Sequence, residues 1–278
     1  TTGAENTAVG KGALSSNTTA SNNTAIGRSA LLLNTTGVEN TAAGSGALAD
    51  NTTAEGGSAF GKDALANNTT GDNNTSVGTS SMQQNTTGSE NTAIGNQALK
   101  ANTTGSNNVV MGYQALYTAN IGNTVAIGYK ALYANSDTGY NNTAVGYLSL
   151  TNNTTGDDNT ALGRESLEEN TTGSDNTAVG YKALTANTTG SYNTAGGISA
   201  LATNTTGDFN TAFGRLALLD NTSGDSNTAL GTNALTNNTS ADSNTAVGTN
   251  CMNQNTTGTQ NTAIGDSSLR GATTGVGN

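Results

Sequence analysis

The sequence of 278 residues contains no proline, tryptophan or histidine, and its single cysteine is Cys251. Without histidine the chain has no imidazole general base and no partner that would activate Cys251 as a nucleophile. One cysteine also excludes an internal disulfide framework. We therefore expect a protein that is not an enzyme and has no catalytic residues and no cofactor. Cys251 stands where other repeats have Ala or Ser, which predicts a packed thiol.

Charge and hydrophobicity are also scarce, with 10% charged, 4% aromatic and 32% hydrophobic residues. The net charge is −10, and the nine basic residues are scattered, which argues against nucleic acid as a partner. The longest apolar run, 30–33, is far too short for membrane insertion. Disordered chains with so little hydrophobicity usually carry proline and charge, and this chain carries neither. Its composition suits a stack of small repeated units.

An internal repeat organises the whole sequence, in units close to N-T-A-[VI]-G-x-x-A-L-x-x-N-T-T-G-x-x. The glycine that ends the first motif of each unit recurs at Gly10, Gly27, Gly44, Gly61, Gly78, Gly95, Gly112, Gly128, Gly146, Gly163, Gly180, Gly197, Gly214, Gly231, Gly248 and Gly265. The spacing is 17 residues except for one step of 16 and one of 18, both next to Gly128.

A unit of 17 residues is too short for a pair of helices, and its Gly and Thr residues disfavour helix. The repeat predicts an all-β fold, a parallel β-solenoid (β-roll or β-helix) with about 17 residues per coil and roughly sixteen coils, forming one domain over 1–278. Strands of three to five residues would alternate with Gly and Asn corners. Stacked coils would form ladders of Val/Ile and of Leu. Because the chain begins and ends within a repeat, we expect it to be part of a longer protein or filament.

An asparagine precedes the first strand of most units, as at Asn23, Asn40, Asn74 and Asn91. Two interpretations fit this position. The side-chain amides would bond from coil to coil as a ladder, or each Asn would close a local turn. Both roles are structural.

The run N-T-A-I-G, as in 23–27 and 91–95, followed by a small residue three positions later, resembles the repeat of YadA-like trimeric autotransporter adhesin heads. That repeat reads approximately N-S-V-A-I-G-x-x-S-x-A. The resemblance implies trimers of parallel β-rolls on a bacterial surface. Related repeats occur in phage tail fibres. This chain has a longer unit, Thr in place of Ser, an additional N-T-T-G segment and no visible coiled-coil stalk.

The second corner of each coil carries N-x-[S/T] acceptor patterns for glycosylation. These candidate sites are Asn17, Asn34, Asn51, Asn68, Asn85, Asn102, Asn153, Asn170, Asn187, Asn204, Asn221, Asn238 and Asn255. We expect them on exposed corners along one edge, where they would carry covalent glycans. The alternatives are O-glycans on the paired threonines, such as Thr18 and Thr19, or a plain turn with a Thr ladder.

Six of the eight tyrosines lie between residues 113 and 147. Five of them form a candidate contact patch: Tyr113, Tyr117, Tyr129, Tyr133 and Tyr147. Three follow the motif glycine directly, at a position that other units give to Lys or Arg, so we expect them to be exposed. Stacked exposed tyrosines form contact surfaces for glycans or proteins. The alternative is an aromatic ladder that stabilises locally disturbed coils.

Acidic residues gather before the N-T-A corner, for example Glu39, Asp72 and Asp225. Each coil offers too few carboxylates for calcium, so we expect a solvated acidic edge and no metal site. Rows of threonine also raise ice binding. However, Thr18 and Thr19 are adjacent and would face opposite ways in a strand, which leaves a single outward row.

These observations predict a structural subunit of an extracellular or cell-surface fibre or filament, decorated with glycans on the Asn-Thr-Thr edge. The expected partner is the chain itself, as a head-to-tail filament or a trimer. The alternatives are the head of a trimeric bacterial adhesin or a phage tail fibre on the virion surface, and an ice-binding protein.

Overall fold

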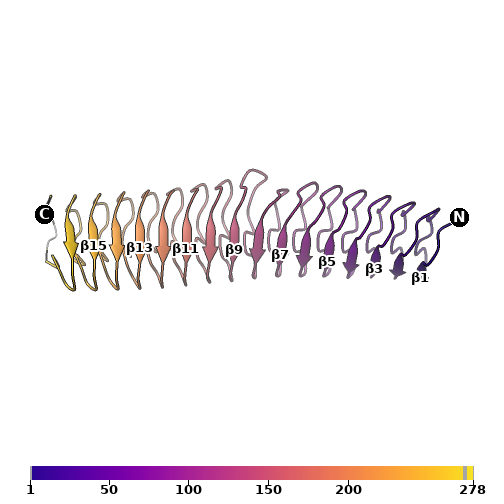
Figure 1. Cartoon of the computed structure of the whole chain (residues 1–278), viewed down its shortest axis with the longest axis horizontal. Coiled ribbons are helices and arrows are strands. Elements are labelled where there is room, and N and C mark those ends of the chain that lie inside the picture. The colour runs from indigo at the N-terminus through magenta and orange to yellow at the C-terminus, as the bar shows by residue number, and fades with distance from the viewer. Residues whose placement is uncertain (1, 272–273, 278) are drawn as a thin grey trace. The chain divides into compact units, whose positions relative to one another are not determined.

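The computed structural model describes residues 2–271 and 274–277. The predicted domain, 1–278, also includes Thr1, Ala272, Thr273 and Asn278, which lie outside the described residues. The chain divides into two units, Thr1–Tyr140 and Asn141–Asn278. Each unit is a β-solenoid, and each coil contributes one strand (Figure 1).

The strands of the first unit are β1 (Thr7–Val9), β2 (Thr24–Ile26), β3 (Thr41–Ala43), β4 (Ser58–Phe60), β5 (Thr75–Val77), β6 (Thr92–Ile94), β7 (Val109–Met111) and β8 (Val125–Ile127). Those of the second unit are β9 (Thr143–Val145), β10 (Thr160–Leu162), β11 (Thr177–Val179), β12 (Thr194–Gly196), β13 (Thr211–Phe213), β14 (Thr228–Leu230), β15 (Thr245–Val247) and β16 (Thr262–Ile264).

Within each unit, every strand pairs in parallel with the next one along the chain, and like residues meet. For example, Ala8 faces Ala25 and Ala161 faces Ala178. The all-β solenoid with about 17 residues per coil is therefore confirmed, and the strands have the predicted length of three residues. The registered stacking satisfies backbone groups between coils, as where the Thr24 amide donates to Asn40 O at 2.8 Å.

The two sides of each strand differ in burial because side chains alternate along it. The central residue, as at Ala25 in β2, lies inside the coil with no exposed surface. The third residue points outward, and Ile26 is 46% exposed. The predicted ladder of Val and Ile therefore exists, but it lies on the outer face of the sheet and not in the core.

The Ala–Leu pair after each motif glycine packs differently from a strand. Ala30 and Leu31 are adjacent, and both are fully buried. Leu31 has a φ of 49°, in the left-handed region, and this conformation turns consecutive side chains to the same side. Left-handed backbone is very unfavourable for β-branched residues. This explains why the position contains only Leu or Met and never Val or Ile.

Asparagine forms two buried ladders in each unit. At the strand start, the amide N–H of Asn40 donates to Oδ1 of Asn23 at 3.0 Å. At the second corner, Nδ2 of Asn51 donates to Oδ1 of Asn34 at 2.8 Å and to Ala54 O at 3.1 Å. The ladder interpretation of the strand-start asparagines is confirmed.

The motif glycine cannot be replaced without moving the backbone. Gly27 has a φ of +134°, and a Cβ there would lie 2.5 Å from the carbonyl oxygen of Gly44 in the next coil. The requirement is therefore both conformational and steric.

The coil with the 16-residue spacing interrupts the corner ladder. Ala119 occupies the ladder position and cannot donate a bond, and Asn102 Oδ1 is left without a partner. The next residue compensates, because Asn120 Oδ1 accepts the amides of Thr103, Thr104 and Gly105 at 2.9, 2.7 and 3.1 Å. The shortened coil is thus repaired by a side chain that replaces the missing peptide acceptor.

Candidate functional site

Four tyrosines of the first unit form two stacked pairs. The rings of Tyr113 and Tyr129 have centroids 5.5 Å apart, and those of Tyr117 and Tyr133 are 5.3 Å apart, each pair within 10° of parallel. Tyr113 and Tyr129 are 44% and 42% exposed. The predicted aromatic ladder therefore exists, and it is at the same time an exposed surface.

Two lysines complete this surface. Nζ of Lys130 lies 5.7 Å from the centroid of Tyr129 and 4.9 Å from that of Tyr133. Nζ of Lys100 lies 5.6 Å from the centroid of Tyr117. Both ammonium groups are in the range of cation–π attraction. These six residues, Lys100, Tyr113, Tyr117, Tyr129, Lys130 and Tyr133, are called the tyrosine–lysine face below.

The fifth predicted tyrosine, Tyr147, belongs to the second unit and has a different environment. The guanidinium of Arg164 lies 5.6 Å from the centroid of Tyr147 and 5.4 Å from that of Tyr181. Lys182 Nζ lies 5.6 Å from the Tyr181 centroid. Tyr147, Arg164 and Tyr181 each follow the motif glycine in successive coils, so the repeat stacks a cation between two rings.

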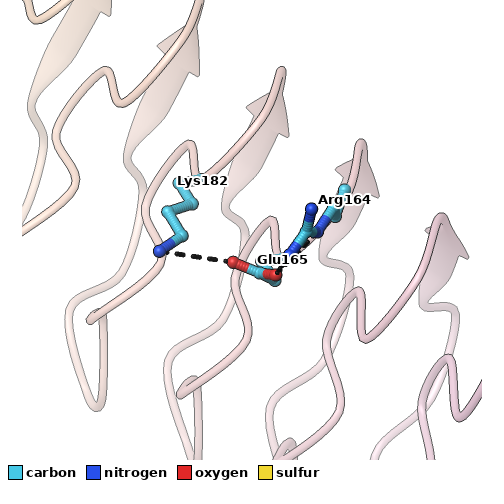
Figure 2. Close-up of polar contacts among 3 residues, drawn as sticks. All are labelled: Arg164, Glu165 and Lys182. Atoms are coloured by element: carbon cyan, nitrogen blue, oxygen red, sulfur yellow. Dashed lines mark hydrogen bonds and ion pairs between the residues drawn. The ribbon is translucent and has the colours of Figure 1, made fainter.

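A carboxylate holds the cations of this second cluster in place (Figure 2). Oε1 of Glu165 accepts from Arg164 Nε at 2.7 Å and pairs with Nη2 at 2.6 Å, and Oε2 lies 3.4 Å from Lys182 Nζ. Glu165 is only 8% exposed. Burial alone would raise its pKa, but the bonds from Arg164 and Lys182 outweigh burial and lower the pKa below its ordinary value.

The two cations respond in the opposite direction. The hydrogen bond to Glu165 raises the pKa of both Arg164 and Lys182. Nearby Glu168 has a raised pKa, first because of burial and then because of the charges of Glu165 and Glu169. The cluster is a locally neutralised network, and it can act as a fixed surface more readily than as a proton donor or acceptor.

Sequence reasoning missed these cations and one further aromatic pair. Tyr192 and Phe209 stack with centroids 4.9 Å apart and are 55% and 58% exposed. Both precede the strand-start Asn and are 17 residues apart, so the repeat register contained this signal. Lys100, Lys130 and Arg164 were recognisable in the same way, since each shares or adjoins a tyrosine column.

The glycosylation candidates do not lie where the sequence indicated. Except for Asn17, which is partly exposed, all of them are buried with at most 1% of their surface exposed. Nδ2 of Asn170, for example, donates to Asn153 Oδ1 and Gly173 O. A glycan on such a nitrogen would remove ladder bonds and require the coil to open. The expectation of exposed Asn side chains is wrong, because these amides form the corner ladder.

The two threonines after each corner Asn have different environments. Thr35 is half-buried, and its hydroxyl donates to Thr52 O at 3.0 Å. Its neighbour Thr36 is exposed. The second threonine is therefore the accessible hydroxyl of this edge.

Part of the acidic edge has a structural task. Oδ1 of Asp225 and of Asp242 accepts the amide of the equivalent residue in the preceding coil, at 2.8 Å. Ser174 Oγ takes the same bond from Asp157. Carboxylates and hydroxyls are interchangeable at this position because either can accept the bond.

Among the residues that the structure describes, no group of three or more His, Cys, Asp or Glu side chains is arranged to hold a metal ion. Cys251 is buried, its thiol donates to Ala263 O at 3.2 Å, and burial raises its pKa. Over the same described residues, no helix has the length and apolar character to cross a membrane.

Comparison with known proteins adds no relative. No model of a known protein family matches the chain, and no curated protein matches it. The resemblance to adhesin heads and tail fibres therefore stays a prediction based on the repeat motif.

Proposed function

We propose that this chain is a structural segment of an extracellular surface fibre, in which copies associate through the outer face of the sheet. One observation supports the proposal. The third residue of nearly every strand forms an outward row of apolar side chains, called the outer apolar row below. Its most exposed members are Val9, Ile26, Phe60, Ile94, Met111, Leu162, Val179, Phe213, Leu230 and Ile264.

Two physical arguments favour a covered face. Parallel sheets are ordinarily buried on both sides, whereas here only one side packs against the coil interior. Monomeric proteins also rarely expose long contiguous apolar patches, because covering them contributes roughly 25 cal/mol per Å². The occupant that fits best is a second copy, since its own row repeats with the same coil spacing and can match in register.

The neighbouring row on this face is compatible with such packing. The first residue of most strands is a half-buried Thr, and it points to the same side as the apolar residue. Thr and Val/Ile are β-branched residues that pack well across pleated surfaces. The interface would thus be a narrow, mixed strip of the same composition in every coil.

A trimeric adhesin head is the second candidate function, and the same row supports it. Three copies around a common axis would cover their outer faces as completely as two copies in a fibre. The arrangement of copies distinguishes the candidates, because a fibre would extend by repeated contacts and a trimer would close.

Ice binding, the third candidate from the sequence, requires a flat and regular array. The outer face does contain a Thr row beside an apolar row, but the large side chains of Phe60, Met111 and Phe213 project from it. A fibre interface accommodates such variation more easily than a crystal plane does. Thermal hysteresis near zero is the expected result.

Electron microscopy of the native assembly on its source cell or particle tests the proposal. Continuous filaments at the cell surface would support the fibre, closed three-copy heads would favour the adhesin, and isolated intracellular monomers would contradict both. Intact-mass measurement of the same material tests glycan decoration. A mass equal to the sequence mass would exclude it, and added hexose units would be expected on exposed second threonines such as Thr36.

A further inference from the structure

The tyrosine–lysine face differs chemically from the rest of the first unit. It lies at three positions of the coil, which are one, two and five residues after the motif glycine. In the coils of Gly95, Gly112 and Gly128, these positions hold Asn96, Gln97, Lys100, Tyr113, Gln114, Tyr117, Tyr129, Lys130 and Tyr133. None of the nine is acidic, although the whole chain has a net charge of −10.

We propose that the tyrosine–lysine face binds an anionic polysaccharide. This goes beyond the fibre proposal, and it requires no self-association. Tyrosine rings offer an apolar body and a hydroxyl, which suits sugars that present both C–H edges and hydroxyl groups. Lysine ammonium groups supply attraction for carboxylate or sulfate. The surrounding amides of Gln97 and Gln114, which bond to each other at 2.8 Å, add further polar partners.

The face is arranged before any ligand arrives. The stacked pairs fix the four rings, and Lys130 is positioned between Tyr129 and Tyr133. Pre-ordered side chains lose little conformational entropy on binding. A polar ligand can therefore be held with useful affinity by a surface without a deep pocket.

The spacing of the charges favours a polymer. Lys100 and Lys130 belong to coils that are two steps apart, which corresponds to about 10 Å along the stack. A chain of sugars running along the coils would meet one ammonium group, then the ring pairs, then the next ammonium group. A protein partner would instead need a desolvated apolar centre, and these nine positions offer none.

A hollow continues the face. It has a volume of about 590 Å³ and is lined by residues that directly follow the tyrosines of the second pair, namely Thr118, Ala134, Asn135, Ser136, Asp137 and Thr138. Thr118 Oγ1 contacts Tyr133 O at 3.1 Å, which links hollow and face. The hydroxyl and amide lining suits an uncharged sugar unit, and it extends the surface along which a polysaccharide would lie.

The test is a binding titration of the purified chain by biolayer interferometry. The probes are immobilised polygalacturonate for carboxylate and dextran sulfate for sulfate, with unmodified dextran as neutral control and poly-glutamate as a polyanion without sugars. We expect binding to at least one of the anionic glycans, and the preferred probe identifies the anion. Binding to neither one, or equally strong binding to poly-glutamate, would overturn the proposal.

The repeat itself supplies matched variants. Lys100→Gln with Lys130→Gln introduces residues that neighbouring coils hold at these positions, and we expect binding to weaken at least ten-fold. Lys11→Thr with Lys62→Thr makes the same change in net charge outside the face, and its effect should stay below two-fold. Equal losses in the two double variants would show a general charge effect and contradict the proposal. Unchanged unfolding midpoints confirm that all variants are folded.

Tyr113→Thr with Tyr129→Thr tests the ring contribution, again with a residue that other coils carry at this position. We expect at least a five-fold loss of affinity. Unaltered affinity would mean that the rings are only a structural ladder and would sink the proposed mode of binding. Failure here leaves the fibre proposal untouched, since that proposal depends on the outer apolar row.

Discussion

The interior of the coils and their outer surface follow different rules. Inside, the same residues recur with little change, as in the Leu31 position and the two Asn ladders. Outside, the position after the motif glycine varies between Lys11, Tyr113 and Ile198. The interior must satisfy buried amides and left-handed backbone in every coil, whereas the surface has no such constraint. The contrast indicates that the interior specifies the fold and the surface is free to carry function.

The largest effect is expected from breaking the corner ladder. Asn170→Ala removes two bonds donated by Nδ2 and the acceptor for Asn187 Nδ2, and it leaves buried polar partners unsatisfied. The free energy of unfolding should fall by about 3 kcal/mol or more. Urea unfolding followed by circular dichroism measures it. Thr172→Ala, an exposed site in the same coil, should change the value by less than about 0.5 kcal/mol. Similar losses in both variants would erase the distinction between interior and surface.

A subtler interior change tests the left-handed leucines. Leu201 is fully buried with a φ of 54°. Leu201→Met should cost less than about 1.5 kcal/mol, since Met82 and Met252 already occupy the equivalent position. Leu201→Val should cost about 1–2 kcal/mol more, because a β-branched residue resists this backbone. Equal costs in thermal unfolding would show that side-chain volume, and not backbone conformation, selects leucine.

The Glu165 network should give a smaller effect that depends on pH. Its pKa is lowered in the folded chain, so the ionised form stabilises the fold above the unfolded pKa of about 4.5, and this contribution is lost as the pH falls through the folded pKa. Glu165→Gln should therefore lower Tm slightly at pH 7 and have no effect at strongly acidic pH. Asp175→Asn provides the control, with equal charge change at an exposed site. A Tm decrease that is independent of pH would contradict the ion-pair account.

The smallest change in stability is expected on the tyrosine–lysine face. Tyr129→Thr removes one stacked ring from an exposed position, where such pairs contribute roughly 0.2–1 kcal/mol. Differential scanning calorimetry should show a decrease within that range. A loss as large as that of Asn170→Ala would mean that the rings are needed to hold the disturbed coils together.

Much of the fold could be predicted because the repeat forces every coil to solve the same packing problem. The strand at Thr24–Ile26 and the Asn23 ladder followed from spacing and residue type. The burial of the Ala30–Leu31 pair and the exposure of Ile26 could not, since alternation along a strand says which residues oppose each other but not which side is the interior. A left-handed Leu31 has no sequence signature except the absence of Val and Ile.

The candidate site was less predictable. Column positions identified Tyr113 and Tyr129 as stacked, but grouping Tyr147 with them overlooked that it belongs to another unit, beside Arg164. The acceptor pattern at Asn34 was misleading, because the same tripeptide that permits glycosylation also builds a buried amide ladder. Local motifs do not reveal burial, which depends on the next coil.

Sedimentation velocity over a range of concentrations tests the central claim, that the outer apolar row joins copies of the chain. The wild-type protein should sediment as dimers or larger species at micromolar concentration, and Val179→Lys with Phe213→Lys should shift it to monomer without unfolding it. Thr189→Lys with Thr206→Lys places the same charges on the exposed second-threonine edge and should leave association intact. A wild-type protein that remains monomeric at all concentrations, or association that survives the Val179 and Phe213 substitutions, would contradict the account.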